Sequence, residues 1–250
     1  MSLALEHKRR VLAQGVSAVA SAVAAAALPY SPGEALGSPA NARKHLALME
    51  AALDEDLARL SAIQGMATRQ DLKRSELLPK YQEYIRSSDL YQEYIQRYIE
   101  SGLVFPNRIL VQVMVWLFDT AQFVDALELA DIAMAQGQVM PERFKRRDIQ
   151  TFVADSVCEW AYDEYKAQRS PEPYLSDLLP RVDGEWDLPE QIPAKFHKLI
   201  GIRAQEDKEW ATALQHLERA QQLYSKVGVE TRIENCRKAL RKQEAAAGAQ

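Results

Sequence analysis

Residues 109–138 read ILVQVMVWLFDTAQFVDALELADIAMAQGQ, an apolar run that turns acidic partway along. The apolar part, residues 109–118, contains Gln112 and ends at Asp119. A membrane-spanning helix needs about 20 apolar residues, so this run is too short to cross a bilayer. The stretch DTAQF interrupts the pattern and supplies Asp119 or Thr120 as a helix cap. The sequence therefore predicts two helices joined by a short turn.

The second helix of this hairpin carries small apolar residues at helical spacing, and Gly137 is suited to close it. Small side chains let a neighbouring helix approach closely, so they mark the seam between the two helices. The predicted seam consists of Phe123, Ala126, Leu127, Ala130 and Ala133.

A related pattern, WATALQHLERAQQLY, occupies residues 210–224. Its Ala213 and Leu214 align with Ala126 and Leu127, and Gly201 precedes Ala213 at the distance found in a tetratricopeptide hairpin. The first copy has Met114 in place of that glycine. These features predict two repeat-like helical hairpins within one α domain that resembles tetratricopeptide proteins.

The composition favours an all-α fold. Hydrophobic residues make up 47% of the 250 residues, which is enough for a sizeable core, and only 10 Gly and 11 Pro occur. No segment alternates apolar and polar residues as a strand does. The two isolated cysteines, Cys158 and Cys236, suit a reducing compartment better than a disulfide framework.

The N-terminal part predicts two helices and a linker. Residues 3–27 have the outline of a signal peptide, but their alanine-rich, weakly apolar run favours a helix in contact with solvent. Residues 28–41 form a Pro/Gly-rich linker, and Ser38 and Pro39 start the next helix. That helix carries an apolar stripe, which packs either within the chain or against another subunit: Leu46, Met49, Leu53, Leu57, Leu60 and Ile63.

The pentapeptide YQEYI occurs at residues 81–85 and again at 91–95. The offset is close to three helical turns, so both copies share one aromatic face. Such a face can stack on nucleic-acid bases, but packing in a core or interface is the favoured interpretation.

The C-terminal half predicts a helix spanning the 140s to the 160s, a proline-rich loop over residues 169–193 and a last helix over residues 229–246. Residues 226–242 hold six Lys and Arg against two Glu. Residues 243–250 are expected to be disordered.

Motifs for phosphate binding, dinucleotide binding, zinc proteases or serine hydrolases are absent from the sequence. The four histidines, His7, His45, His197 and His216, fall in different segments, so we expect no metal site. The consecutive carboxylates at 54–56 point in different directions on a helix, which favours a solvated face over a two-metal nuclease site. We therefore expect no catalytic site of the chain's own, and no cofactor.

Basic residues are the remaining polar signal. The chain has a net charge of −4, but residues 1–80 carry 10 Lys and Arg against 8 Asp and Glu, whereas the other 170 residues carry 21 against 27. Residues 143–147 and the last helix are rival basic patches. The predicted DNA contacts are Lys8, Arg9, Arg10, Arg43 and Lys44, with Lys73 and Arg74 in reserve.

Several motifs in combination resemble the small terminase subunits of tailed phages, in the family of the M protein. They are ELLP at 76–79, W-x-x-D-T at 116–120, DALELA at 125–130 and the Met-Pro and basic run at 140–147. Further on, the resemblance includes K-x-H-K-x-x-G at 195–201, A-L-x-H-L-x-R-A at 213–220 and Gly228.

The resemblance covers residues 76–242 and implies a role in viral genome packaging. Small terminase subunits recognise double-stranded viral DNA, deliver it to a large ATPase subunit and commonly assemble as homo-oligomeric rings in the host cytoplasm, without a membrane. In this family the small subunit has also been assigned as the endonuclease component. We accordingly expect DNA binding and oligomerisation in residues 1–75, a terminase domain over 76–242 and a tail over 243–250. The alternative is a scaffold that binds only protein.

Overall fold

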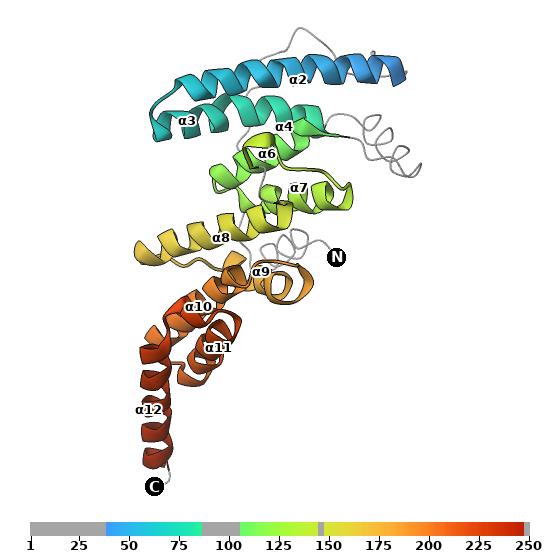
Figure 1. The fold of residues 1–250 in the computed structure, drawn as a ribbon. Coiled ribbons are helices and arrows are strands. Elements are labelled where there is room, and N and C mark those ends of the chain that lie inside the picture. Colours follow the sequence, from blue (N-terminus) through green and yellow to red (C-terminus); the bar gives the residue numbers. More distant parts are fainter. Residues whose placement is uncertain (1–38, 87–105, 145–147, 248–250) are drawn as a thin grey trace. The chain divides into compact units, whose positions relative to one another are not determined.

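The computed structural model describes residues 39–86, 106–144 and 148–247, and within these ranges every regular element is helical, with no strand. The expected helix at 3–27, Lys8, Arg9, Arg10 and the second YQEYI copy lie outside the described residues. The chain divides into two compact units, residues 1–149 and 150–250. The all-α prediction is confirmed, and each unit is described by itself (Figure 1).

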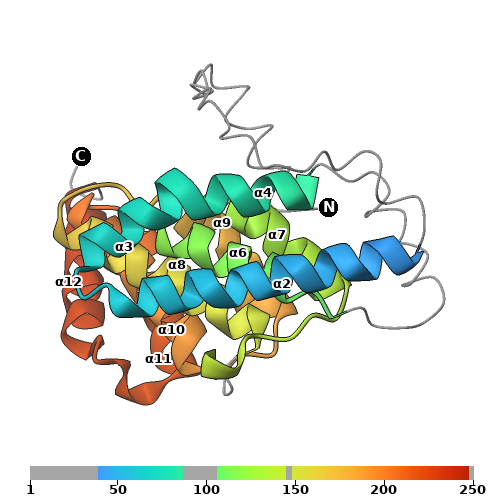
Figure 2. The ribbon, with the colours of Figure 1, turned by 90° about the horizontal axis from the view of Figure 1, so that it is seen from above.

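The first unit begins with α2 (Pro39–Ala62), which starts at the proline that the sequence predicted. The chain returns through α3 (Met66–Leu72), a π-helical turn η1 (Lys73–Leu77) and α4 (Leu78–Arg86). Figures 1 and 2 show α2 and the α3–α4 segment as antiparallel neighbours over α6. The functional boundary expected at residue 75 falls within η1.

The apolar stripe of α2 is buried unevenly. Leu53 and Leu60 are buried, whereas Leu46 and Leu57 are half-buried. The half-buried positions are consistent with either of the two packing partners that the periodicity allowed.

A carboxylate lies inside that stripe, which corrects the expectation of a solvated face at 54–56. Asp54 and Glu55 are exposed, but Asp56 is only 4% exposed. Its Oδ2 accepts hydrogen bonds from the Tyr81 hydroxyl and from Lys80 Nζ, each at 2.8 Å, and its Oδ1 accepts from Arg59 at 2.9 Å. Because a buried carboxylate is costly unless it is hydrogen-bonded, these donors explain how Asp56 is accommodated.

Tyr81 confirms that the first YQEYI copy packs rather than stacks on a ligand. Its side chain is fully buried, and its ring lies 5.7 Å from that of Trp116. The hydrogen bond to Asp56 and burial both raise the pKa of the Tyr81 hydroxyl, which therefore remains a donor at neutral pH.

The hairpin predicted at 109–138 is present as α6 (Arg108–Asp119) and α7 (Phe123–Ala135). All residues from Ile109 to Phe118 are buried, as are the five seam residues of α7. Gly137 closes α7 with a φ of 63°, and Gln138 N donates to Ala133 O. This confirms the predicted seam and the predicted helix end.

Two details of the predictions are wrong. Gln122, with no side-chain hydrogen bond, precedes α7, while the Thr120 hydroxyl donates back to Trp116 O at the end of α6. The proline-rich stretch 169–193 is not a surface loop, because it forms α9 (Tyr174–Pro180) and the π-helical turn η3 (Arg181–Glu185). Leu175, Leu178 and Val182 anchor it in the core.

The second unit contains α8 (Ile149–Lys166), α10 (Gln191–Glu206), α11 (Trp210–Leu223) and α12 (Glu230–Ala247). A Cβ on Gly201 of α10 would lie 2.8 Å from Leu217 Cγ, so glycine is what permits the close approach of α11. The hairpin is confirmed, whereas its tetratricopeptide character stays a prediction. No helix in the described ranges is both long and apolar enough to cross a membrane.

Candidate nucleic-acid interface

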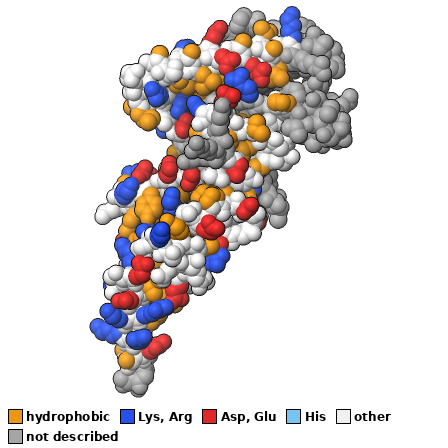
Figure 3. Space-filling view, viewed as in Figure 1, with side chains coloured by type: hydrophobic (Ala, Val, Ile, Leu, Met, Phe, Trp, Pro, Cys, Tyr) orange, Lys and Arg blue, Asp and Glu red, His pale blue; other side chains and the backbone are white. Residues whose placement is uncertain are grey.

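The most prominent basic surface on the described residues runs along the second half of α12. Figure 3 shows Lys and Arg side chains gathered at this end of the chain. They define the C-terminal stripe, which consists of Arg237, Lys238, Arg241 and Lys242. All four are exposed, and their spacing places them on one side of the helix.

The opposite side of α12 explains why the stripe faces outward. Val229, Ile233 and Cys236 recur at spacings of four and three and are buried against Ala213 and Leu217. This contact sets the rotation of the helix, and the charged positions consequently point away from the core.

Within the C-terminal stripe, Arg237 is held by Glu218 at 2.6 Å, whereas Lys238, Arg241 and Lys242 make no ion pair with any described residue. The stripe spans about 7.5 Å along the helix axis at 1.5 Å per residue. That length matches about two phosphates along one DNA strand. A single copy of the stripe therefore has only a small phosphate footprint.

The cations predicted from the sequence are placed differently. Lys44 is exposed on α2. Arg43 also belongs to α2, but its side chain, like Lys8, Arg9 and Arg10, lies outside what the structure describes. The structure therefore neither gathers these five residues nor separates them.

Lys73 and Arg74, the reserve residues, make contacts within the first unit. Lys73 Nζ lies 2.8 Å from Asp119 Oδ2, and its side chain is 11% exposed. Arg74 Nη2 donates to Thr120 O at 3.3 Å. Both contacts join η1 to the end of α6, so engaging DNA through these residues requires that they leave present partners.

The rival patch at 143–147 is partly built into the first unit. With the Gln112 amide oriented by its neighbours, its oxygen accepts from Trp116 Nε1 and from Arg143 Nη2, each at 3.0 Å. Burial lowers the pKa of Arg143. Arg143 thus accounts for the polar residue in the apolar run of α6, while Lys145, Arg146 and Arg147 lie outside the described residues.

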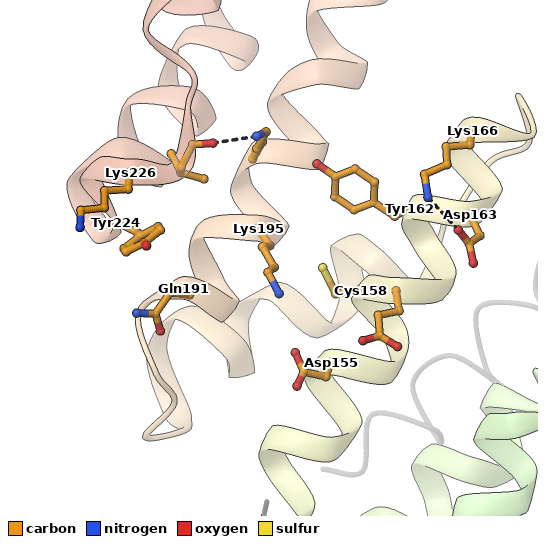
Figure 4. Close-up of a pocket in the computed structure, with 12 residues that line it drawn as sticks. Asp155, Cys158, Tyr162, Asp163, Lys166, Gln191, Lys195, Tyr224 and Lys226 are labelled. Carbon is orange, nitrogen blue, oxygen red and sulfur yellow. Dashed lines mark hydrogen bonds and ion pairs between the residues drawn. The ribbon is translucent and has the colours of Figure 1, made fainter.

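A cleft of about 740 Å³ lies in the second unit between α8, α10 and the short helix η4 (Ser225–Val227) (Figure 4). Lys195 and Lys226 approach it from one side, and the acidic residues Asp155, Glu159 and Asp163 of α8 line the other. Because its walls carry opposite charges, the cleft is a poor site for a polyanion. Burial raises the pKa of the Cys158 thiol in it to about 12, so this thiol stays protonated and unreactive at neutral pH.

The structure brings together two histidines that the sequence analysis kept apart. His197 of α10 and His216 of α11 have Nδ1 atoms 2.9 Å from each other. The signal was present in the predicted hairpin, since Gly201 and Leu217 must face each other and each histidine lies within one helical turn of them. The described residues contain no group of three or more His, Cys, Asp or Glu arranged to hold a metal.

Comparison with known proteins identifies the class. Residues 50–191 match the family model described as phage small terminase subunit. The chain is 33% identical to the "Probable terminase, endonuclease subunit" of Haemophilus phage HP1 over 76% of its own length and 68% of that protein. It is 30% identical to the "Terminase, endonuclease subunit" of Escherichia phage P2 over 68% of its length and 64% of that protein.

The chain belongs to the phage small terminase subunit family. This confirms the resemblance drawn from the sequence motifs and assigns the chain to phage DNA packaging. No solved structure matches it.

Proposed function

We propose that this chain binds double-stranded DNA at its phage's packaging site and delivers it to the large, ATP-hydrolysing terminase subunit in the host cytoplasm. Family membership carries this proposal. The relatives are named endonuclease subunits, and we propose that this chain directs end cutting by positioning DNA rather than by hydrolysing it.

The proposed contacts are Lys8, Arg9, Arg10, Arg43 and Lys44. The reserve residues Lys73 and Arg74 come second, because both have partners in the first unit. The C-terminal stripe is the second candidate surface, since three of its four cations are exposed and have no ion pair among the described residues. In a homo-oligomeric ring, each weak patch is repeated, so a small footprint per subunit suffices for stable binding.

Binding to packaging-site DNA and to scrambled DNA of equal length, measured by fluorescence anisotropy over a range of salt concentrations, tests the proposal. Phosphate contacts release counterions, so affinity should fall steeply with salt, and each lost contact should reduce the log–log slope by about 0.9. No binding to either duplex at low salt favours the protein-only scaffold. Metal-dependent cleavage by the purified chain alone contradicts the positioning role.

Three multiple variants separate the surfaces. Replacing Arg9, Arg10, Arg43 and Lys44 with Ala should abolish site-specific binding and leave helicity and mass unchanged. Replacing Lys238, Arg241 and Lys242 with Ala should reduce affinity and slope if the C-terminal stripe contributes. The charge-matched control replaces Lys166, Lys195 and Lys226, which line the mixed-charge cleft, and should leave the slope unchanged. If only the stripe variant loses binding, the N-terminal assignment is wrong.

A further inference from the structure

Four polar side chains form a continuous chain of hydrogen bonds across three elements of the second unit. Asp183 belongs to η3, His197 to α10, and His216 and Arg219 to α11. His197 Nε2 lies 2.9 Å from Asp183 Oδ2, and the Nδ1 atoms of the two histidines lie 2.9 Å apart. Arg219 donates to both oxygens of Asp183, at 2.7 and 2.8 Å.

This geometry determines where the protons are when both imidazoles are neutral. A carboxylate only accepts, so His197 must carry its proton on Nε2 and present a lone pair at Nδ1. His216 must then donate from its own Nδ1, which leaves its Nε2 as an acceptor. Each tautomer is thus fixed by the preceding member, starting from Asp183.

The same chain limits how many protons it accepts. A first added proton goes to Nε2 of His216 and leaves the hydrogen bond between the rings intact. A second proton must go to Nδ1 of His197, where two N–H groups then face each other across 2.9 Å. It also places a second positive charge near Arg219, so the two rings titrate as a coupled pair.

The surroundings oppose protonation of the rings. Burial lowers the pKa of His197 despite the opposing effect of Asp183, and burial together with the charge of His197 lowers the pKa of His216. The charged groups facing the pair are Asp183 from η3 and Arg219 from α11. Glu218 of α11 also lines the adjoining pocket and is held by Arg237 of α12.

Asp183 is well placed to transmit a change in this chain to the backbone. It departs from helical geometry within η3, with φ −113° and ψ 45°. Its side chain ties this turn to both helices of the hairpin, and the turn ends where Trp186 N donates to Arg181 O at 2.8 Å. Losing the side-chain contacts of Asp183 leaves Val182 as the buried anchor of η3.

We propose that Asp183, His197 and His216 form a proton-sensitive latch that holds η3 on the α10–α11 hairpin at neutral pH and releases it when both imidazoles are protonated. The histidine latch involves no residue of the proposed DNA contacts, so it is a conformational control additional to them.

The direction of the pH dependence follows from linkage. The folded-state pKa of each histidine is lowered from 6.5, so the unfolded chain binds more protons below that value. The latch's stabilisation is complete above pH 6.5 and is lost progressively as the pH falls below it. The pKa of Asp183 is lowered from 3.8, so its own titration occurs at lower pH and is distinguishable.

Imidazole ¹⁵N NMR of the full-length protein at pH 8 tests the geometry directly. We expect His197 as the Nε2–H tautomer and His216 as the Nδ1–H tautomer, with both resonances changing in coupled steps on acidification. Two Nε2–H tautomers, or independent titration of both rings at 6.5, overturn the proposal.

Hydrogen exchange from pH 7.5 to pH 4.5, corrected for intrinsic rates, tests the release. The protection of the Trp186 amide should fall at least tenfold more than that of amides in the middle of α11. His216→Asn keeps a donor near the Nδ1 position but cannot be protonated, so its profile should be flat, whereas His45→Asn in the other unit should behave as wild type. Equal pH dependence in wild type and His216→Asn contradicts the latch.

Discussion

At the scale of single residues, Asp54 and Asp56 show how far neighbouring carboxylates can differ. Asp54 pairs with Arg108 in solvent, with both side chains more than half exposed. Asp56 is buried and accepts three hydrogen bonds. Burial alone would raise the pKa of Asp56, but the hydrogen bonds from Lys80 and Tyr81 and the charge of Lys80 lower it below 3.8.

Replacing Asp56 with Asn should lower the free energy of unfolding of the first unit by about 1–3 kcal/mol at pH 7, because buried donors lose a charged acceptor. The lowered pKa means that the carboxylate stabilises the fold above 3.8 and that this contribution disappears as the pH falls through its folded-state pKa. The deficit should therefore shrink in acid. Urea unfolding at several pH values measures it.

Asp54→Asn is the matched control. An exposed ion pair contributes about 0–1 kcal/mol, so this variant should unfold nearly as wild type at each pH. Equal losses for the two substitutions would mean that Asp56 has no special role in joining α2 to α4.

At the scale of elements, glycine controls how the hairpin of α10 and α11 packs. A Cβ at Gly201 meets Leu217 at 2.8 Å and Ala213 O at 3.2 Å. Gly201→Ala should therefore destabilise the second unit by about 1–3 kcal/mol through overpacking, as measured by denaturant unfolding.

Gly184 provides the comparison, since nothing lies within 4 Å of a Cβ placed there. Gly184→Ala should leave the free energy of unfolding within about 1 kcal/mol of wild type. If Gly201→Ala is equally harmless, the two helices have room to separate and the close approach is not a constraint.

At the scale of the whole molecule, we expect a homo-oligomer. Leu48 is 61% exposed on α2, beside a stripe that is only partly buried within the first unit. Leu48→Glu should lower the mass in solution at micromolar concentration, measured by light scattering, because a charge there opposes apolar contact between subunits.

Val139→Glu is the control for the oligomer. Val139 is 79% exposed and follows α7, so the same change of charge there should leave the assembly intact. A wild-type species of 28.2 kDa at this concentration rules out the oligomer.

Sequence alone was sufficient for the helical class, the α6–α7 seam, the close approach at Gly201 and the family resemblance. These depend on periodicity and on short motifs, which are local in the chain. It failed at residues 169–193, because proline and glycine density does not reveal that Leu175, Leu178 and Val182 are buried.

Tertiary structure decided which polar residues have partners. The contacts Asp56–Tyr81, Lys73–Asp119 and Asp183–His197 join residues 25, 46 and 14 positions apart. A charge in a sequence is the same letter whether water or a buried partner surrounds it. Only packing determines that Lys73 is occupied while Lys238 is exposed, because desolvation and hydrogen bonding depend on what the fold brings near.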